Sequence, residues 1–543
     1  MNLEALLAAR LAVALEAVAG EPVDPVVRAS QHADFQSGAA LALARKLGRA
    51  PRQIAAEVAA RADLAGLAEA EISGPGFLNL TVADDVLVAL LAEPVAPPPV
   101  EPQRVVIDYS GPNVAKELHV GHLRSTIIGD ALARLFTWAG HDVVRVNHLG
   151  DWGTQFGMLI EHMADLAPKR ALSGPSGELS LSDLTAFYRQ ARVKFDGDDD
   201  FRTRARLRVV ALQSGDGPTR QMWQRLVEQS ERSFVADYDR LGITLGAADF
   251  AGESSYQDQL ASVLDELTAK GLVVESEGAL CAFPAGFTGR DGEPFPLIVR
   301  KSDGGFGYAA TDLAALRHRT RDLKGDRLLY VVGAPQSMHF QMVFAVGRDA
   351  GWLGDAATAE HISFGSILGA DGKMLKSRSG ETIKLADLLD EADARATAPA
   401  VGIGAIKYAD LSADRRGDYV FDWDRMLATT GNTGPYLQYA VARIRSVLRK
   451  AVAEPGPVVL GDPAERRLAL ALLGLEPVVA AAIEHCEPHR LAVHLHEVAA
   501  AFSTFYERCP IQSSPSRVAL TARTGDSLRL GLDLLGIPLP EVM

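Results

Sequence analysis

The sequence is poor in cysteine and lacks long apolar runs, and both absences narrow the possible protein classes. Its 543 residues include 3 cysteines, Cys281, Cys486 and Cys509, which are far apart and form no C-x-x-C pair. Neither a disulfide framework nor a zinc site is therefore expected, and a reducing cytoplasm suits the chain. The most apolar stretch is broken by Glu476 and Pro477 and is shorter than the ~18 residues of a membrane-spanning helix.

Acidic residues outnumber basic ones, with 69 Asp and Glu against 55 Lys and Arg, so the formal net charge is −14. Phosphate contacts need local positive charge, so this value does not favour a nucleic-acid partner, although it leaves room for a basic face. The first 20 residues are rich in Leu and Ala, but Glu4, Arg10 and Glu16 interrupt the apolar core that a signal peptide needs. They predict an amphipathic helix.

The chain is too long for one hydrophobic core and divides at a proline-rich stretch. Residues 93–103, EPVAPPPVEPQ, cannot hold a regular helix and are predicted to be a linker. They separate an N-terminal module, residues 1–92, from the remainder. No internal repeat is present, and 48% hydrophobic with 23% charged residues is typical of a globular protein.

The region 104–421 shows the alternation of an α/β fold. RVVIDYS (104–110) and DVVRVNHLG (142–150) read as strands on either side of a helix that ends near Gly140. Further strands are expected at RLLYVVG (327–333) and HISFGSILG (361–369), which predicts a split, Rossmann-like, doubly wound parallel sheet with an insertion at about 160–300. Residues 422–543 are predicted to form a helical bundle.

One candidate site is GPNVAKELHVGH (111–122), which places two histidines at the start of a helix after a strand. A helix N-terminus offers unpaired N–H groups to an anion, Gly121 allows close approach of the backbone, and His119 and His122 add donors. A capped helix with ordinary histidines is the alternative. The preceding strand favours a nucleotide site, because doubly wound folds bind ligands at the carboxyl ends of strands.

A second candidate is GADGKMLKSRSGE (369–381), a glycine-rich loop that carries Lys373, Lys376, Ser377 and Arg378. Its cations suit a departing pyrophosphate, and its glycines allow movement. A solvated basic loop is the alternative.

These two segments resemble known signatures. HVGH is similar to the HIGH motif and KMLKS to the KMSKS motif of class I aminoacyl-tRNA synthetases. Longer strings, including YSGPNVAKELHVGHLRSTIIGDAL, NHLGDWGTQFG, FGYAATDLAAL and NTGPYLQYAVARIRSVL, resemble arginyl-tRNA synthetases, and the similarity runs to the last residue. Gly111 departs from the Ser or Ala of many relatives, and Leu375 replaces the central Ser of KMSKS.

The resemblance implies ATP-dependent activation of L-arginine to arginyl-adenylate, followed by transfer to the 3′-terminal adenosine of tRNA(Arg), with Mg²⁺ beside the triphosphate and no zinc. It implies a catalytic role for His119, His122, Lys116, Lys373 and Lys376. It also implies ATP binding by His119, Gly121, His122, Phe364, Gly365, Lys373 and Lys376.

Arginine needs an anionic acceptor, because a carboxylate matches the guanidinium fork. By resemblance Asp312 is this acceptor, beside Tyr308 and Gln336, while Asn113 with Ser110 or the Gly111 backbone holds the amino-acid head. The alternative for Asp312 is an N-cap of the helix TDLAALRHR. Trp152 is expected either in the pocket wall or in ordinary packing.

Contacts to tRNA are expected at both ends of the chain. Tyr436, Tyr439, Arg443 and Lys450 share one helix face next to a buried stripe, Leu437, Ala440, Val441, Ile444, Val447 and Leu448. By resemblance this face and Met543 lie near the anticodon, and Phe77 and Asn79 approach the tRNA elbow. A half-exposed aromatic rim and a glycine turn leading into an edge strand are the alternatives.

Two other functions fit part of the pattern. A nucleotidylyltransferase also uses H-x-G-H, but such domains are shorter and lack the second cationic loop and the helical bundle. A catalytically inactive tRNA-binding paralogue is disfavoured by the intact histidines, lysines and Asp312. Relatives often need tRNA for the first step, and a monomer is expected from the family alone.

Overall fold

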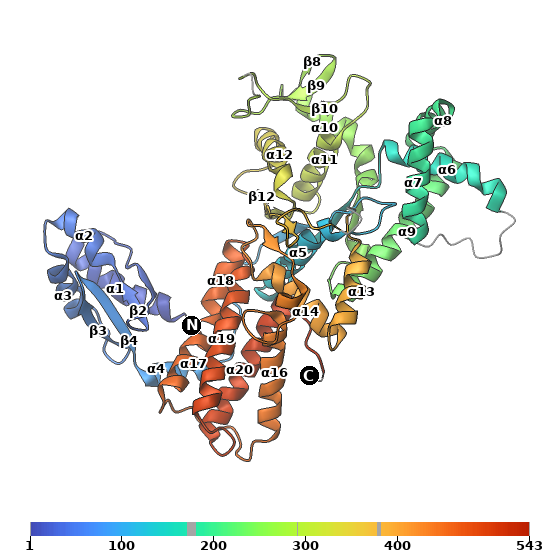
Figure 1. Cartoon of the computed structure of the whole chain (residues 1–543). Helices are drawn as coiled ribbons and strands as arrows, with labels where there is room; N and C mark the ends of the chain where they lie inside the picture. Colours follow the sequence, from blue (N-terminus) through green and yellow to red (C-terminus); the bar gives the residue numbers. More distant parts are fainter. Residues whose placement is uncertain (1, 171–180, 290–291, 377–381, 542–543) are drawn as a thin grey trace.

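The computed structural model describes residues 2–170, 181–289, 292–376 and 382–541. Figure 1 shows an N-terminal module standing to one side, a central α/β region and a C-terminal helical bundle that contacts both. The predicted fold class, a parallel Rossmann-like sheet with an N-terminal α+β module and a helical C-terminal region, is confirmed.

The N-terminal module packs three helices on a four-stranded antiparallel sheet of order β1-β2-β4-β3. Its first helix begins after Asn2, whose side chain accepts from Ala5 N, and ends at Gly20 in the left-handed conformation. The elements are α1 (Leu3–Ala19), β1 (Val27–Ala29), β2 (Phe35–Ser37), α2 (Ala39–Leu47), α3 (Pro51–Arg61), β3 (Ala68–Ser73) and β4 (Phe77–Val82). After α4 (Asp84–Ala92), no helix or strand forms before β5.

The central sheet is wholly parallel and has the order β12-β11-β5-β6-β7. Its strands are β5 (Arg104–Asp108), β6 (Asp142–Leu149), β7 (Phe250–Gly252), β11 (Arg327–Tyr330) and β12 (Thr358–His361). The chain runs from β5 toward β6 and β7, and later returns to the other side of β5 with β11. The boundary between β5 and β11 is therefore the switch point where such sheets bind ligands.

Helices cover both faces of this sheet. Near the switch point lie α5 (Val120–Trp138), α11 (Tyr308–Arg321) and α12 (Ser337–Asp349). The predicted insertion contains α6 (Thr154–Arg170), α7 (Leu181–Gly197), α8 (Asp199–Ser214), α9 (Gly217–Leu241), α10 (Gln257–Ala269) and the strands β8 (Val274–Ser276), β9 (Ala279–Ala282) and β10 (Leu297–Arg300). The three strands form a separate antiparallel sheet, at the top of Figure 1.

One strand prediction was wrong in its position. HISFGSILG was predicted to be a single strand, but β12 ends at His361 and a short β13 (Ile367–Leu368) pairs with β14 (Tyr419–Val420) in a different sheet. Between them Phe364 bridges to Gly333 at the end of the main sheet. Gly365 allows the backbone to pass close to Gly417 there, since a Cβ at residue 365 would come within 2.6 Å of the Gly417 carbonyl oxygen.

The C-terminal region is almost entirely helical, as predicted. After α13 (Leu385–Arg395), α14 (Pro399–Leu411) and α15 (Trp423–Met426), the bundle contains α16 (Gly434–Arg449), α17 (Pro463–Leu473), α18 (Leu475–Glu484), α19 (His489–Arg508) and α20 (Pro515–Leu534). The predicted apolar stripe of α16 is buried except at Leu448, which is half-buried. None of the described helices has both the length and the apolar character of a membrane span.

Candidate active site

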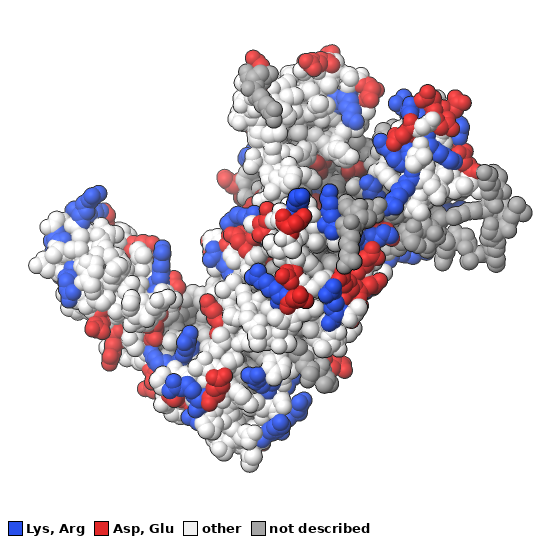
Figure 2. All heavy atoms as spheres, in the orientation of Figure 1, with Lys and Arg blue, Asp and Glu red and all other residues white. Residues whose placement is uncertain are grey.

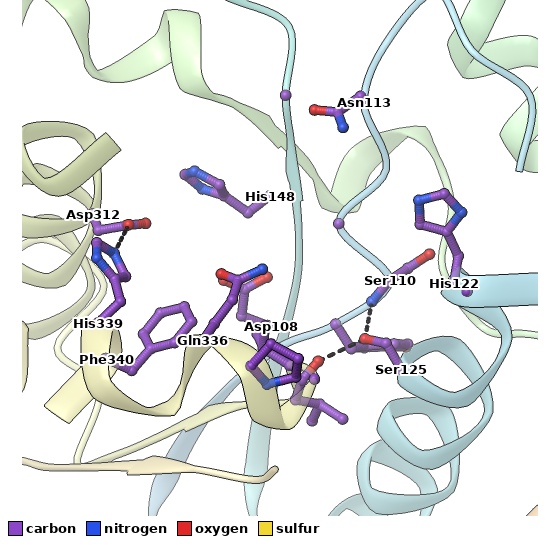
Figure 3. A pocket seen from close by; sticks show the side chains of 18 of the residues that line it. Asp108, Ser110, Asn113, His122, Ser125, His148, Asp312, Gln336, His339 and Phe340 are labelled. Carbon is purple, nitrogen blue, oxygen red and sulfur yellow. Dashed lines mark hydrogen bonds and ion pairs between the residues drawn. The ribbon is translucent and has the colours of Figure 1, made fainter. Parts of the chain in front are cut away.

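A cavity of about 700 Å³ opens at the switch point of the sheet. Four strands deliver residues to it at their carboxyl ends: Asp108 from β5, His148 from β6, Glu253 just after β7 and Val331 just after β11. In Figure 3, Asp312 and His339 lie at one side of this cavity and Ser110, Asn113 and His122 at the other, with His148 and Gln336 between them. The cavity thus has an acidic end and a histidine end.

The loop after β5 is held in an unusual backbone conformation. Ser110, Gly111 and Ala115 have φ values of 75°, 58° and 63°, in the left-handed region that side chains disfavour. Its amides are fixed by side chains, since Ser110 N donates to Ser125 Oγ at 2.9 Å and Gly111 N donates to Asn147 Oδ1 at 2.9 Å. This loop carries Asn113 into the cavity, with its side chain against Gly150.

The two histidines cap α5. His119 Nδ1 accepts from Gly121 N at 3.0 Å, and His122 Nδ1 accepts from His119 N at 3.2 Å. A neutral imidazole that accepts at Nδ1 carries its hydrogen on Nε2. Both rings line the cavity, with centroids 4.0 Å apart, so each retains an Nε2–H donor for a ligand.

Burial keeps these rings neutral. It lowers the pKa of His122 to about 3, aided by the neighbouring His119 and Lys116, and it lowers the pKa of His119 in the same direction. Gly121 leaves room for the His119 ring, because a Cβ at residue 121 would lie 2.8 Å from His119 Cε1. The predicted nucleotide-binding segment is therefore a rigid pair of neutral donors at a helix N-terminus.

The acidic end brings together α11, α12 and the turn after β7. Asp312 lies inside α11, whose N-cap is Gly307, so the alternative role of Asp312 as an N-cap is excluded. Its Oδ2 lies 2.6 Å from His339 Nε2. Tyr308, one turn earlier on α11, is 75% exposed and lines the same cavity, as does Gln336.

Glu253 is the second carboxyl group at this end. Burial, with the charges of Asp312 and Asp151, raises the pKa of Glu253 to about 8. Asp151 itself is occupied, since it accepts from Ser254 N at 2.8 Å and from Ser254 Oγ. Two closely spaced carboxyl groups that face a cavity suit a cation with several N–H donors.

Beneath the cavity, Asp108 is paired with a buried cation. Arg319 Nη2 lies 2.8 Å from Asp108 Oδ2, and the Arg319 side chain is 1% exposed. Its guanidinium also stacks over the Tyr330 ring at 4.8 Å. This pair fixes the floor of the cavity at the end of β5.

The loop with the predicted lysine pair is joined to the histidine segment by its following residues. Val120 N donates to Ile383 O at 3.0 Å, Leu385 N donates to Leu118 O at 2.9 Å, and Lys384 Nζ lies 2.7 Å from Glu117 Oε2. Residues 377–381 lie outside the described part of the chain. Two segments more than 250 residues apart in sequence are thus fastened together beside the cavity.

Several predicted site residues do not line this cavity. Lys373 and Lys376 are exposed on the loop after β13, and Lys116 lies over the Tyr188 ring at 4.9 Å. Trp152 packs edge-on against Trp223 at 5.7 Å, which supports its alternative role in packing. The predicted residues that do line the cavity are Ser110, Gly111, Asn113, His119, Gly121, His122, Tyr308, Asp312, Gln336 and Phe364; Gly365 is not among them.

The Ser110 hydroxyl is less available to bind the amino-acid head than predicted. Its hydroxyl lies 2.7 Å from Tyr238 Oη and accepts from Thr126 Oγ1 at 2.9 Å. The side chain is therefore engaged within the protein. Asn113 remains as the side chain of the predicted head-group pair that faces the cavity.

Among the cavity residues that sequence reasoning missed, four carry a carboxyl or imidazole group: Asp108, His148, Glu253 and His339. A signal existed for two of them, because Asp108 and His148 stand at the carboxyl ends of predicted strands. Glu253 follows β7, which has only 3 residues and gives no recognisable pattern. His339 follows Gln336 by one helical turn.

The predicted anticodon face contains a second hollow, of about 610 Å³. Arg443 stacks over Tyr439 at 4.7 Å and over Tyr506 at 5.5 Å, and all three residues line it. Tyr436 lies elsewhere, half-buried with its hydroxyl 3.2 Å from Ser503 Oγ. Figure 2 shows acidic and basic side chains interspersed over the visible face, including basic groups on the bundle.

The N-terminal residues predicted to approach the tRNA elbow differ in exposure. Phe77 is half-buried, and Asn79 is 9% exposed and accepts from Gln36 Nε2 at 2.7 Å. β4 lies between β2 and β3, so the alternative of an edge strand is wrong. Met543 lies outside the described residues.

Comparison with known proteins matches the whole chain to one family. Three family models cover it in order: an arginyl-tRNA synthetase N-terminal domain over residues 2–82, the catalytic domain of class I tRNA synthetases (R) over 87–423 and a DALR anticodon-binding domain over 437–543.

Individual proteins give the same result. The arginine–tRNA ligase of Thermobifida fusca is 51% identical, with 99% of each chain covered, and that of Escherichia coli (strain SMS-3-5) is 45% identical, with 100% of each covered. The solved arginyl-tRNA synthetase of Plasmodium falciparum has a TM-score of 0.86 at 27% identity, over 100% of this chain and 99% of that one. The Thermus thermophilus enzyme has a TM-score of 0.84 at 27% identity, with both chains covered completely. The chain therefore belongs to the arginyl-tRNA synthetase family of class I and is an arginine–tRNA ligase.

Proposed function

We propose that the switch-point cavity activates arginine, with the guanidinium between Asp312 and Glu253 and the amino-acid head beside Asn113. The observation that carries this assignment is the polarity of the cavity, with carboxyl groups at one end and neutral imidazole donors at the other. Tyr308 and Gln336 complete the wall around the substrate side chain. ATP lies at the histidine end, with its adenosine toward Phe364.

In the first step, a carboxylate oxygen of arginine attacks the α-phosphorus of ATP and pyrophosphate leaves. In the second, a ribose hydroxyl of the terminal adenosine of tRNA attacks the activated carbonyl, and AMP leaves. Proteins assist phosphoryl transfer mainly by positioning and charge stabilisation. His119 and His122 supply fixed Nε2–H donors to the phosphate oxygens, and Lys116, Lys373 and Lys376 supply positive charge to the pyrophosphate.

Mg²⁺ is proposed to accompany the triphosphate of ATP. Among the described residues, no group of three or more His, Cys, Asp or Glu side chains is arranged to hold a metal ion. In nucleotide sites Mg²⁺ is usually bound by substrate phosphates, water and one or two carboxylates, so the triphosphate itself would hold the ion here. When bound, it would neutralise negative charge on the leaving pyrophosphate.

The tRNA is assigned to two surfaces. The Tyr439 and Arg443 face stacks on unpaired anticodon bases, because aromatic rings and guanidinium planes suit that contact. Phe77 and Asn79 belong to the module that approaches the elbow. The proposed form is a monomer acting in the cytoplasm, where its three buried cysteines remain thiols.

Pyrophosphate exchange tests the arginine assignment. With arginine, ATP and tRNA present, Asp312→Asn is expected to raise the KM for arginine roughly 100-fold or more, because a desolvated guanidinium loses a charged partner. The KM for ATP is expected to change less than about twofold. Equal changes in both constants, or none in either, would contradict the placement of the guanidinium.

A further inference from the structure

His339 is a cavity residue to which the proposed function gives no role. It lies in the first turn of α12, three residues after Gln336, and both residues line the cavity. Its ring packs edge-on against Phe340, with centroids 5.4 Å apart and an interplanar angle of 78°. Phe340 in turn contacts the Tyr330 ring of the central sheet at 5.2 Å. The His339 ring is thus supported from the sheet side.

The orientation of the Asp312 carboxylate depends on a hydrogen bond from the His339 ring. The contact between His339 Nε2 and Asp312 Oδ2, at 2.6 Å, is the hydrogen bond that the described residues provide to this carboxylate. A carboxylate only accepts, so the ring hydrogen must be on Nε2. The two side chains are 29% and 18% exposed, so the bond is partly shielded from water and is charge-assisted.

The need for such a bond follows from the neighbouring charges. Glu253 and Asp312 interact closely enough for Asp312 to raise the pKa of Glu253. Without a partner, the Asp312 carboxylate is free to rotate about its side-chain torsion or turn toward water, away from Glu253. With one oxygen held by His339, the other is directed at the cavity, as Figure 3 shows.

We propose that His339 is a positioning residue for arginine recognition: it holds Oδ2 of Asp312 and thereby presents Oδ1 to the substrate guanidinium. This inference rests on the proposed function, in which Asp312 binds that guanidinium. Discrimination between arginine and a substrate with a different side-chain cation then depends on a residue of α12 as well as on the acidic pair. A lysine ammonium, a single point donor, gains less from an oriented carboxylate than the planar fork of arginine.

The test compares His339→Leu with His339→Gln. The Leu variant is expected to raise the KM for arginine roughly 10- to 100-fold, the range for loss of a hydrogen bond to a charged group, while kcat and the KM for ATP change less than about threefold. Gln carries an N–H donor at a similar reach and is expected to recover most of this loss. His318→Leu is the matched control, because His318 forms a similar contact with Asp322 at 2.7 Å outside the cavity.

The double variant with Asp312→Asn separates a positioning role from a direct one. If His339 acts through Asp312, adding His339→Leu to Asp312→Asn raises the KM for arginine by less than about twofold. Independent, multiplicative effects would show that His339 acts without Asp312 and would overturn the inference. A normal KM in Asp312→Asn alone would instead overturn the proposed function, so the two failures are distinguishable. Thermal unfolding of each variant checks that the fold is kept.

Discussion

At the scale of single residues, the site works through groups whose ionisation is set by burial. His119 and His122 are kept neutral and capped at Nδ1. Glu253 is shifted in the direction that favours its neutral form, with a pKa of about 8. A neutral acid in an empty acidic pocket reduces repulsion from Asp312, and a guanidinium favours its ionised form.

Arginine binding is therefore expected to release a proton. At pH 7 the carboxyl group of Glu253 is mainly protonated in the empty cavity, and the bound cation lowers its pKa, so roughly one proton leaves. The affinity for arginine is expected to rise as the pH approaches 8 and to level off above it. Above that pH, Glu253 is already ionised before arginine binds. The charged groups that raise the pKa of Glu253 are Asp312 and Asp151, and His148 lines the same cavity.

Calorimetry in two buffers of different ionisation enthalpy measures this proton. Glu253→Gln is expected to bind arginine more weakly and to release none. Glu231→Gln is a suitable control, because burial also raises the pKa of Glu231 near Asp151 but that residue does not line the cavity. Equal proton release by wild type and Glu253→Gln would contradict this role.

At the scale of elements, the start of α5 and the start of α13 act as one unit. The backbone bridge between His119 and Lys384 and the ion pair of Lys384 with Glu117 join them. The lysine loop thus returns to the sheet at a fixed point next to the histidines. In the proposed function, positioning of the lysines and the imidazoles on one triphosphate depends on that junction.

Reversing one charge of the ion pair between Glu117 and Lys384 is expected to slow adenylate formation. The pair is partly exposed, so its loss costs about 1 kcal/mol, or roughly fivefold in kcat. Glu117→Lys and Lys384→Glu each place like charges together, and the double variant is expected to recover most of the rate. Reversal of Glu391 and Arg395, an exposed ion pair within α13, is the control. A double variant as slow as the singles would contradict the coupling.

The helices and strands were largely predictable from the sequence, whereas the tertiary contacts between residues of different elements were not. The histidine segment and the strands around it follow from local patterns, namely a β-branched run, a glycine turn and a helical period. Glu253 was not predicted as a site residue, because the strand before it, β7, is too short to show an alternating hydrophobic pattern. Asp312 was ambiguous because TDLAA fits a helix start, and the choice depends on where Gly307 begins the helix. The partner of Asp312, His339, is fixed only by tertiary packing.

At the scale of the whole molecule, one arginine connects the N-terminal module to the bundle. Arg466 of α17 lies 2.6 Å from Asp34 Oδ2 and donates to Val82 O at 2.7 Å, and it also pairs with Asp84. Leu460, Leu470 and Leu473 pack against the core of the module. The two proposed tRNA surfaces are therefore held in a fixed relation, visible in Figure 1 at the contact of α4 and α17.

Removal of this arginine is expected to weaken tRNA use selectively. Arg466→Ala leaves the partly buried Asp34 without its cation, so the module is held less firmly, and the KM for tRNA is expected to rise several-fold. The KM values for arginine and ATP stay within about twofold. Arg467→Ala removes the same charge from an exposed neighbour, and aminoacylation kinetics that change equally in both variants would refute a docking role.

One cavity is proposed to hold arginine and ATP end to end, with Asp312 and Glu253 at one side and His119 and His122 at the other. A crystal structure with a non-hydrolysable arginyl-adenylate analogue tests it most directly. The guanidinium nitrogens are expected within hydrogen-bond distance of Asp312 and Glu253, and the phosphate is expected beside Nε2 of His119 and His122. A guanidinium bound away from both carboxyl groups, or a phosphate remote from both imidazoles, would contradict it.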